Sequence, residues 1–523
     1  MEPLNSVEWG PIDANRADEL FTEKWIEPDH IRTCLDSANW IVTGEKGSGK
    51  SAIQRAIREI HESMYFVTPL VSFNDVTFRA ISENLVSLAD TTKISKTSTL
   101  SNYWQYCIIV ELIKACSQKD GYIYGNVAQE IPQERRRRAA KLNFNLLSLL
   151  EEAWNKIDFF TEPEERGARR SRRANLLGSH GLSAALLHDL STFPLDARFQ
   201  GIKHEFYNLL SKHRHNVILI LDDFDKLRND GTKAESVQLI FESLVDAILS
   251  IRADSACPEF LSIKAFIPHD RYLRISLRDS DKISDISTSI RWTHDTLRQF
   301  VKRRIETTTK ISGHSFSHAW QQVMPRVLVN PVHKLEEDTF EYLVRHTMMR
   351  PRQLQIHLGA LAKRHAGMTI SPTMIPKSVA ASSAEIAKYF IDEFALDYPN
   401  LDKFVLMFSD KNNVMEYSKF REQILHGLRK FDGESGGYLV DSRIDDFYSM
   451  GLFGIVRFAE DNNLNSGHYY PPTREGRHHY VEFFYRRPYS SVSGRLQDDA
   501  LIALHPVFVD YANLKPHSSL IIG

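Results

Sequence analysis

The chain has 523 residues, with hydrophobic, aromatic and charged fractions of 42%, 11% and 25% and a formal net charge of −2. These values are typical of a globular protein and exclude disordered, fibrous and membrane-embedded classes, while the length predicts about two to four domains. Because the chain is nearly neutral, it would meet nucleic acid only through a local basic patch.

The sequence predicts a cytoplasmic protein. No apolar run approaches the roughly 20 residues needed to span a bilayer, and residues 1–11 carry acids and a proline rather than a basic, apolar leader. The four cysteines lack the paired spacing of a zinc site and the density of a disulfide scaffold; they are Cys34, Cys107, Cys116 and Cys257. We expect these cysteines to be reduced and buried. We also expect the protein to have no membrane partner.

The first elements form a strand–loop–helix unit. Residues 39–43 are a short apolar strand candidate, and isoleucines recur at helical spacing over residues 53–60 after a glycine-rich turn. Residues 66–73 predict a second strand, and Pro69 inside it indicates a sheet edge or an interruption.

Residues 75–212 predict a mainly helical insertion with two basic clusters, Arg135–Arg138 and 169–173. These clusters would contact nucleic-acid phosphates or form solvated loops, and the acids beside the second cluster favour the loop. Two continuous apolar runs follow, 217–221 and 260–267, which is the pattern of central parallel strands covered on both faces.

Residues 293–397 predict a helical lid, beginning with an amphipathic helix over 292–305 and continuing past Arg350 to about Phe394. Beyond it, three helix-like stretches and two strands, 452–458 and 480–485, predict a winged helix. Basic side chains flank the predicted wing, where winged-helix proteins touch a DNA backbone; they are Arg474, Arg477, His478, His479, Arg486 and Arg487. DNA contact is one reading of these side chains.

The strongest motif is a complete G-x-x-x-x-G-K-[ST] loop between the first strand and its helix. It consists of Gly44, Glu45, Lys46, Gly47, Ser48, Gly49, Lys50 and Ser51. The glycines let successive N–H groups point at a phosphate, and the following helix adds its positive end. Lys50 would bind the β- and γ-phosphates of ATP, and the Ser51 hydroxyl would ligate Mg²⁺.

Paired acids end the strand over residues 217–221. Asp222 is the candidate Mg²⁺ ligand, and Asp223 is the candidate for polarising the attacking water, with Asp225 a weaker third. Aspartates after a strand also cap helices and form turns. Beside a complete phosphate loop, the catalytic reading is favoured.

With these motifs the chain resembles AAA+/STAND ATPases, and more narrowly the KAP-like P-loop ATPases common in bacterial defence loci. The resemblance spans roughly 20–514. It rests on residues 40–51, the Asp222–Asp223 strand, Trp292 with the following helix, Arg350-Pro351-Arg352, and His505-Pro506. Only the first two motifs are specific.

The resemblance implies roles for further residues. His269 or Asp270 would occupy the sensor position near the γ-phosphate, although asparagine or serine is more usual there. Arg271 would act as an arginine finger within the chain or across an oligomer interface, or form a surface salt bridge. Arg350 and Arg352 would sense nucleotide from the lid, or simply open a helix whose first turn contains a proline.

The sequence therefore predicts an α/β P-loop NTPase fold, with an AAA+/RecA-like parallel sheet, over residues 1–292. The helical lid covers 293–397 and the winged-helix-like domain 398–523. We expect a Mg²⁺-dependent ATPase that works as a homo-oligomer or with an effector protein, and by resemblance in antiviral defence. The alternative is a DNA-binding regulator that uses ATP as an assembly signal with negligible hydrolysis.

Overall fold

The structure, a computed structural model, divides the chain into two compact units, Asp29–Arg291 and Met1–Pro28 with Trp292–Gly523. The described residues are 2–14, 16, 18–72, 96–130, 197–222, 234–276, 280–309, 315–331, 334–433, 437–458, 479–484, 496–517 and 520. Each unit has its own sheet and its own buried core.

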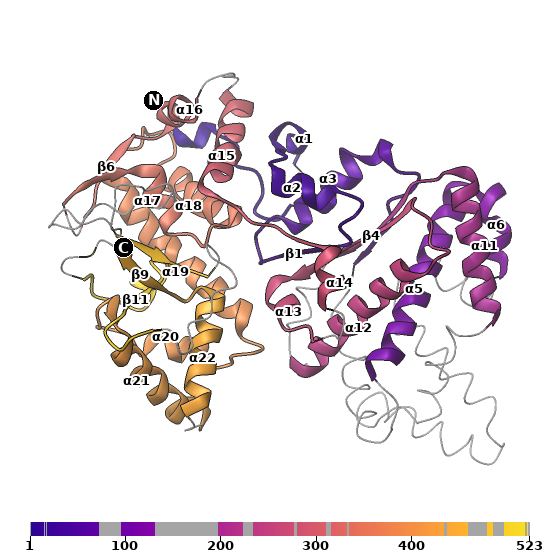
Figure 1. The fold of residues 1–523 in the computed structure, drawn as a ribbon. Helices are drawn as coiled ribbons and strands as arrows, with labels where there is room; N and C mark the ends of the chain where they lie inside the picture. The colour runs from indigo at the N-terminus through magenta and orange to yellow at the C-terminus, as the bar shows by residue number, and fades with distance from the viewer. Residues whose placement is uncertain are drawn as a thin grey trace, which may run out of the picture. The chain divides into compact units, whose positions relative to one another are not determined.

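A five-stranded, all-parallel sheet forms the centre of the unit Asp29–Arg291, with strand order β2-β3-β4-β1-β5 (Figure 1). The strands are β1 (Ile41–Gly44), β2 (Leu70–Ser72), β3 (Val217–Asp222), β4 (Leu261–Pro268) and β5 (Ser287–Ser289). Every residue of β3 and β4 is buried, as the continuous apolar runs predict for central parallel strands. The edge position indicated by Pro69 is confirmed, because β2 pairs only with β3 among the described strands.

Helices cover both faces of this sheet, with α3 on one side and α5 and α12 on the other (Figure 1). They are α2 (Asp29–Leu35), α3 (Lys50–Glu59), α5 (Lys96–Lys119), α6 (Gly121–Glu130), α11 (Ala197–His213), α12 (Ala234–Ala253), α13 (His269–Leu273) and α14 (Ser280–Asp285). Trp104 on α5 donates its Nε1–H to Ser243 Oγ on α12 at 3.2 Å in a buried contact. Although it lies inside the predicted insertion, α5 is therefore part of the core packing; both basic clusters lie outside the described residues.

In the second unit, the described part of the predicted lid consists of five helices and a two-stranded hairpin. They are α15 (His294–Thr309), α16 (Phe316–Val323), β6 (Val327–Val329), β7 (Glu336–Asp338), α17 (Thr339–Arg345), α18 (Pro351–Arg364) and α19 (Met374–Phe394). The N-terminal segment, with η1 (Leu4–Ser6) and α1 (Phe21–Lys24), belongs here because Leu4, Val7 and Trp9 enter the same core. Arg304 Nε and Gln355 Nε2 both donate to Trp9 O, at 3.0 and 2.6 Å. This differs from the predicted assignment of residues 1–28 to the P-loop core.

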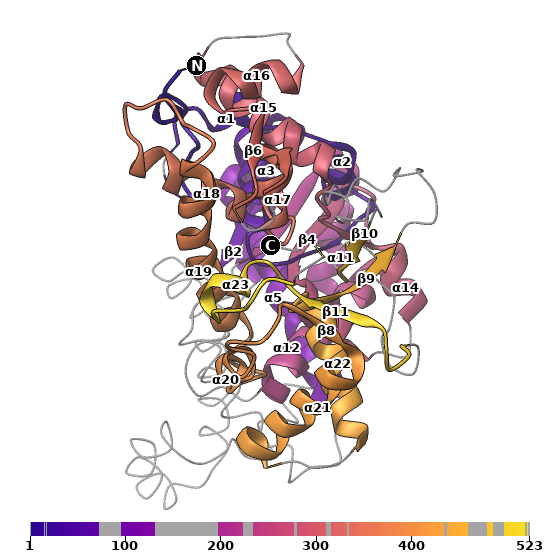
Figure 2. The same cartoon turned by 90° about the vertical axis from the view of Figure 1, so that its left-hand side faces the viewer.

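The C-terminal part contains the predicted three helices and strand pair, together with a four-stranded antiparallel sheet of order β10-β9-β11-β8. The elements are α20 (Leu401–Leu406), β8 (Val414–Glu416), α21 (Tyr417–Gly427), a π-helical turn (Leu428–Asp432), α22 (Gly437–Met450), β9 (Phe453–Phe458), β10 (His479–Glu482), β11 (Leu501–Leu504) and α23 (Phe508–Tyr511). Figure 2 shows α21 and α22 beside this sheet. In this sheet β11 lies between β8 and β9, in addition to the predicted strand pair. The winged-helix assignment stays a prediction.

Parts of α18 and α19 share a hydrophobic core with the C-terminal part. Phe390 on α19 packs edge-on against Phe508 on α23, with ring centroids 5.2 Å apart, and Ile356 on α18 belongs to the same cluster. The two predicted domains are thus parts of one compact unit.

Candidate functional site

The phosphate loop joins the carboxyl end of β1 to the start of α3, which begins at Lys50. Gly47 and Gly49 have φ angles of 85° and 109°, a left-handed region that glycine enters without strain. At Gly44 the constraint is space, because a Cβ atom there would lie 2.5 Å from Ser48 Oγ and 3.1 Å from Ile290 Cδ1. The three glycines of the motif therefore have structural reasons to be glycine.

Lys50 lies over the loop that precedes it. Its side chain is buried, and Nζ donates to Gly44 O at 2.9 Å and to Glu45 O at 3.2 Å. The ammonium group thus stands at the N-terminus of a 10-residue helix, where first-turn N–H groups and the helix dipole favour an anion. This is the charge arrangement that a phosphate group requires.

Asp222 is the last residue of β3 and is 4% exposed. Because β4 separates β3 from β1 in a parallel sheet, Asp222 and the phosphate loop end their strands at the same edge. The Ser51 hydroxyl and the Asp222 carboxylate are hard oxygen ligands of the kind Mg²⁺ prefers, and Mg²⁺ takes only one or two protein carboxylates. These two residues fit a magnesium–nucleotide complex, and Asp223 lies outside the described residues.

A part-buried polar cluster lies at the start of the loop. Thr43, the residue before Gly44, places Oγ1 2.7 Å from Ser289 Oγ and 3.3 Å from His269 Nδ1. The cluster joins the ends of β1, β4 and β5. Sequence reasoning identified His269 as a sensor candidate but missed Thr43, Ser289 and the whole of β5.

Burial is the largest influence on the pKa of His269 and lowers it, while the nearby charges act in both directions. Glu45 raises it, Arg291 lowers it, Asp270 raises it and Lys50 lowers it. Burial therefore favours the neutral imidazole, and the charges of the phosphate loop are close enough to act on it.

Arg271 follows on α13, and its side chain is 1% exposed, with Nε 3.5 Å from Asp270 Oδ2. An arginine finger that works across an interface must be exposed to the neighbouring subunit, so this buried position does not support that role. The predicted role of Arg271 stays a prediction.

Arg350 and Arg352 belong to the other unit, at the start of α18, where Pro351 occupies the first turn as predicted. Arg350 donates from Nη1 to Glu393 Oε2 at 2.6 Å, and both side chains are buried. Arg352 is half-buried. In this conformation Arg350 is therefore engaged inside its own unit, and a nucleotide-sensing role for either arginine stays a prediction.

The parallel sheet, the complete phosphate loop and an aspartate two strands away define a P-loop nucleoside triphosphatase fold, accompanied by a helical domain. Residues 295–392 match the family described as the FunZ-associated C-terminal helical domain. That stretch corresponds closely to the predicted lid, from α15 to α19. No curated protein matches the chain.

Two solved structures show some likeness to this chain. The ORC2 protein of Aeropyrum pernix, in ADPNP–ADP complexes, is 10% identical, with 85% of this chain and 92% of that chain covered and a TM-score of 0.34. The Cdc6p protein of Pyrobaculum aerophilum is 10% identical, with 96% and 95% covered and a TM-score of 0.26. These scores are too low to support an inference about residues or function.

Two further expectations concern the described residues. No helix among them is both long enough and apolar enough to span a membrane. Cys34 and Cys116 are buried free thiols, and burial raises the pKa of each to about 12, as expected for unreactive cysteines. Cys257 is half-buried, with a pKa raised to about 11 chiefly by burial.

Proposed function

We propose that this protein is a Mg²⁺-dependent ATPase whose nucleotide cycle rearranges the chain or its assembly with a partner. The observation that carries the proposal is the phosphate loop, with Lys50 at the N-terminus of α3 and Asp222 at the same edge of the sheet. We expect the chemistry of the molecule at this phosphate loop.

In the proposed reaction the protein positions and compensates charge. Loop N–H groups and Lys50 would hold the β- and γ-phosphates, and Ser51 and Asp222 would hold Mg²⁺, which would supply positive charge to the phosphates. Asp223 orients a water molecule for attack on the γ-phosphorus. The low exposure of Lys50 and Asp222 supports this role, since charge interactions are stronger where water is excluded.

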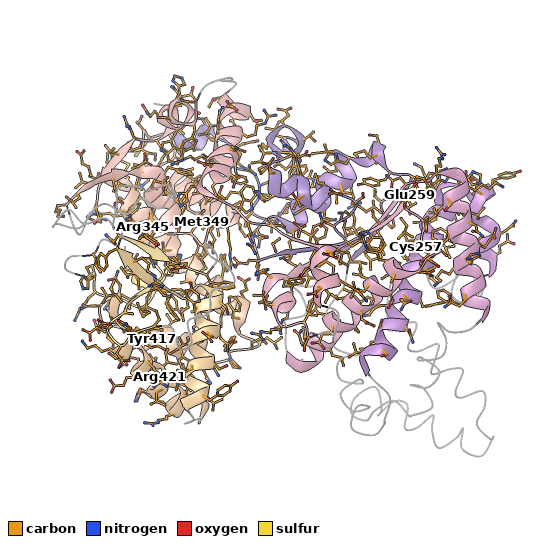
Figure 3. The ribbon with its side chains drawn as sticks, viewed as in Figure 1. Cys257, Glu259, Arg345, Met349, Tyr417 and Arg421 are labelled. Carbon is orange, nitrogen blue, oxygen red and sulfur yellow. The ribbon has the colours of Figure 1, made fainter. Side chains whose placement is uncertain are left out.

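The partner is expected to be a second copy of the chain or an effector protein. Three described aspartates of the C-terminal part lie around Tyr417, a local surrounding that does not suit a DNA backbone. Burial and then Asp441, Asp445 and Asp498 raise the pKa of Tyr417, so these three acids lie around it. Tyr417 and Arg421 lie on α21 (Figure 3), and the Arg421 guanidinium is already paired with Asp441 at 3.1 Å.

DNA contact through this domain would therefore depend on the predicted wing. Among the six basic side chains that flank the predicted wing, His479 is 1% exposed and is not accessible to DNA in this structure. The other five lie outside the described residues. Titration of the full chain with duplex DNA at low and moderate salt tests the DNA-binding alternative; affinity that falls steeply with salt would support it.

Purified full-length protein should bind and hydrolyse ATP with Mg²⁺, and Lys50→Ala should abolish both. Asp223→Ala separates the ATPase from the DNA-binding regulator that uses ATP only as an assembly signal. If the protein works as an ATPase, the variant should still bind ATP but lose hydrolysis and cellular function. If ATP is only an assembly signal, the variant should keep its cellular function. If the wild-type protein neither binds nor hydrolyses ATP, and Lys50→Ala leaves cellular function intact, the proposal is wrong.

The narrower parts of the proposal rest on resemblance alone. These are the KAP-like/STAND subtype and the antiviral role, for which a phage challenge of cells with the wild-type gene and with Lys50→Ala is the direct test. Light scattering of the protein with and without ATP tests the expected homo-oligomer.

A further inference from the structure

The hairpin of β6 and β7 presents two valines on an open strand edge. Val327 and Val329 are 42% and 52% exposed, whereas Leu328 between them is buried in the core of the unit. Among the described strands β6 pairs only with β7, and Figure 1 shows β6 at the margin of its unit. An edge strand that exposes apolar side chains is a template for pairing with another strand.

The hydrogen bonds of the hairpin determine which backbone groups face outward. Asn330 N donates to Leu335 O at 2.8 Å, so these two residues form a hydrogen-bonded pair. Bonded and non-bonded pairs alternate along an antiparallel ladder, and Val329, which lies opposite Glu336, is therefore in a non-bonded pair. The N–H and C=O groups of Val329, and by the same alternation those of Val327, point away from β7.

Two prolines limit this edge to the two valines. Pro325 and Pro331 stand two positions before Val327 and two positions after Val329, and proline has no N–H to donate. If two β6 strands pair antiparallel about Leu328, each Val327 lies opposite the Val329 of the other strand, and every outward N–H and C=O group of the valines is paired. A shift of the register by two residues would place a valine opposite a proline.

The charges of the hairpin favour the β6 edge over the β7 edge. Within the hairpin, Glu336 and Asp338 lie opposite Val329 and Val327 on the exposed face. Pairing through two β7 edges would set these acids against one another, and like charges directly opposite destabilise a sheet. Pairing through β6 keeps the acids one strand away from a contact in which apolar side chains meet.

Buried polar contacts hold the hairpin in place behind this edge. The Glu337 carboxylate accepts from Asn330 Nδ2 at 2.8 Å and from Arg345 Nη1 at 2.7 Å. The Thr339 hydroxyl, directly after β7, accepts from Trp320 Nε1 at 2.9 Å. The edge is therefore presented by a fixed scaffold, and a preorganised surface loses less conformational entropy on association.

We propose that β6 is a self-pairing edge, through which two copies of this chain form a two-fold dimer with a continuous sheet of order β7-β6-β6-β7. The two copies then use the same surface, as a closed two-fold dimer requires. This inference names the surface of the homo-oligomer expected under the proposed function and does not depend on ATP hydrolysis. Because the contact is small, we expect a dissociation constant in the micromolar range.

The test is sedimentation velocity of the full-length protein without nucleotide, from about 1 to about 200 µM. The wild type should form a dimer over this range. Val329→Pro removes an outward N–H without removing a bond to β7, and it should weaken dimerisation at least about tenfold. Val327→Lys/Val329→Lys sets lysine against lysine across the two-fold axis and should weaken dimerisation similarly.

A charge swap tests the register of the pairing. Val327→Glu/Val329→Lys places glutamate opposite lysine at both ends of the contact, and it should dimerise within about threefold of wild type. The matched control Met368→Lys, at a side chain 56% exposed in the same unit, should also dimerise as wild type. General damage to the hairpin would weaken both charged double variants alike, so their difference identifies the contact.

The outcomes separate this inference from the proposed function. A wild type that stays monomeric over the whole range overturns the self-pairing edge, and a strand from a different protein is then the occupant to test. A dimer that Val329→Pro and the double lysine variant leave unchanged also overturns it, because the contact then lies elsewhere. Lys50→Ala should dimerise as wild type, and failure of the wild type to bind ATP would overturn the proposed function alone.

Discussion

Replacing Glu393 by glutamine distinguishes a structural Arg350 from a nucleotide-sensing one. The two side chains are 5% and 4% exposed and meet at 2.6 Å, which is the geometry of a charge-assisted bond in a dry environment. Glutamine has nearly the same shape but removes the negative charge that the buried guanidinium faces at 2.6 Å. Breaking a buried pair in this way costs about 3–5 kcal/mol.

The loss of stability should be local to α18 and α19, the two helices that the Arg350–Glu393 pair joins. Hydrogen exchange of these helices should accelerate about a hundredfold or more, which corresponds to about 3 kcal/mol. The double variant Arg350→Met/Glu393→Met removes both charges and should recover most of the protection, because an apolar pair replaces a buried ion pair at little cost. ATP affinity should change less than threefold in both variants if Arg350 is structural.

Two results would refute this reasoning. Unchanged exchange in Glu393→Gln would show that the pair does not stabilise the unit. A fall of tenfold or more in ATP affinity for Arg350→Met, with Glu393→Gln unaffected, would show that the arginine senses nucleotide, as the resemblance implies. The matched buried pair Arg345–Glu337, at 2.7 Å, provides a control whose disruption should reduce stability without any effect on ATP.

Gly44→Ala should weaken ATP binding at least tenfold, because its Cβ would lie 2.5 Å from Ser48 Oγ, and adding Ser48→Ala should restore part of the affinity measured by calorimetry. Trp104→Phe should lower the free energy of unfolding by about 1–2 kcal/mol in a denaturant titration without changing ATPase activity, because it removes the donor to Ser243 Oγ. Burial lowers the pKa of His357 from its ordinary 6.5 to about 4. The buried neutral histidine therefore contributes to the stability of the fold above pH 6.5, and this contribution is lost as the pH falls toward 4. A loss of about 3 kcal/mol is expected over this range, and His357→Gln should flatten the pH dependence of the melting temperature.

The sequence predicts β3 and β4 because central parallel strands must be apolar on both faces, and Asp222 because it ends such a run. It does not predict β5, since Ser287–Ser289 is a short, polar, half-buried edge strand without a periodic pattern. The polar cluster is equally inaccessible, because Thr43 lies 226 residues from His269 and 246 from Ser289. Only the three-dimensional pairing of β1 with β4 and β5 brings these residues together.

The position of the N-terminal segment changes how the nucleotide would act on the lid. Because Met1–Pro28 belongs to the lid's unit, the chain passes between the units twice, at Pro28–Asp29 and at Arg291–Trp292. The first passage continues through α2 to a turn that is fixed to the sheet, since the buried Lys264 on β4 donates to the carbonyl oxygens of Asp36 and Asn39. The second follows β5, whose Ser289 belongs to the Thr43 cluster.

The passage at Pro28–Asp29 is thus anchored on β4 by Lys264, which contacts no phosphate-loop residue among the described contacts. The passage at Arg291–Trp292 follows Ser289, whose hydroxyl contacts Thr43 at the start of the loop. A change in phosphate charge would therefore act more directly on the second passage than on the first. Ser289→Ala should then uncouple nucleotide binding from changes in hydrogen exchange of α15 while leaving ATP affinity within about threefold of wild type. Unaltered exchange coupling in Ser289→Ala would place the transmission elsewhere.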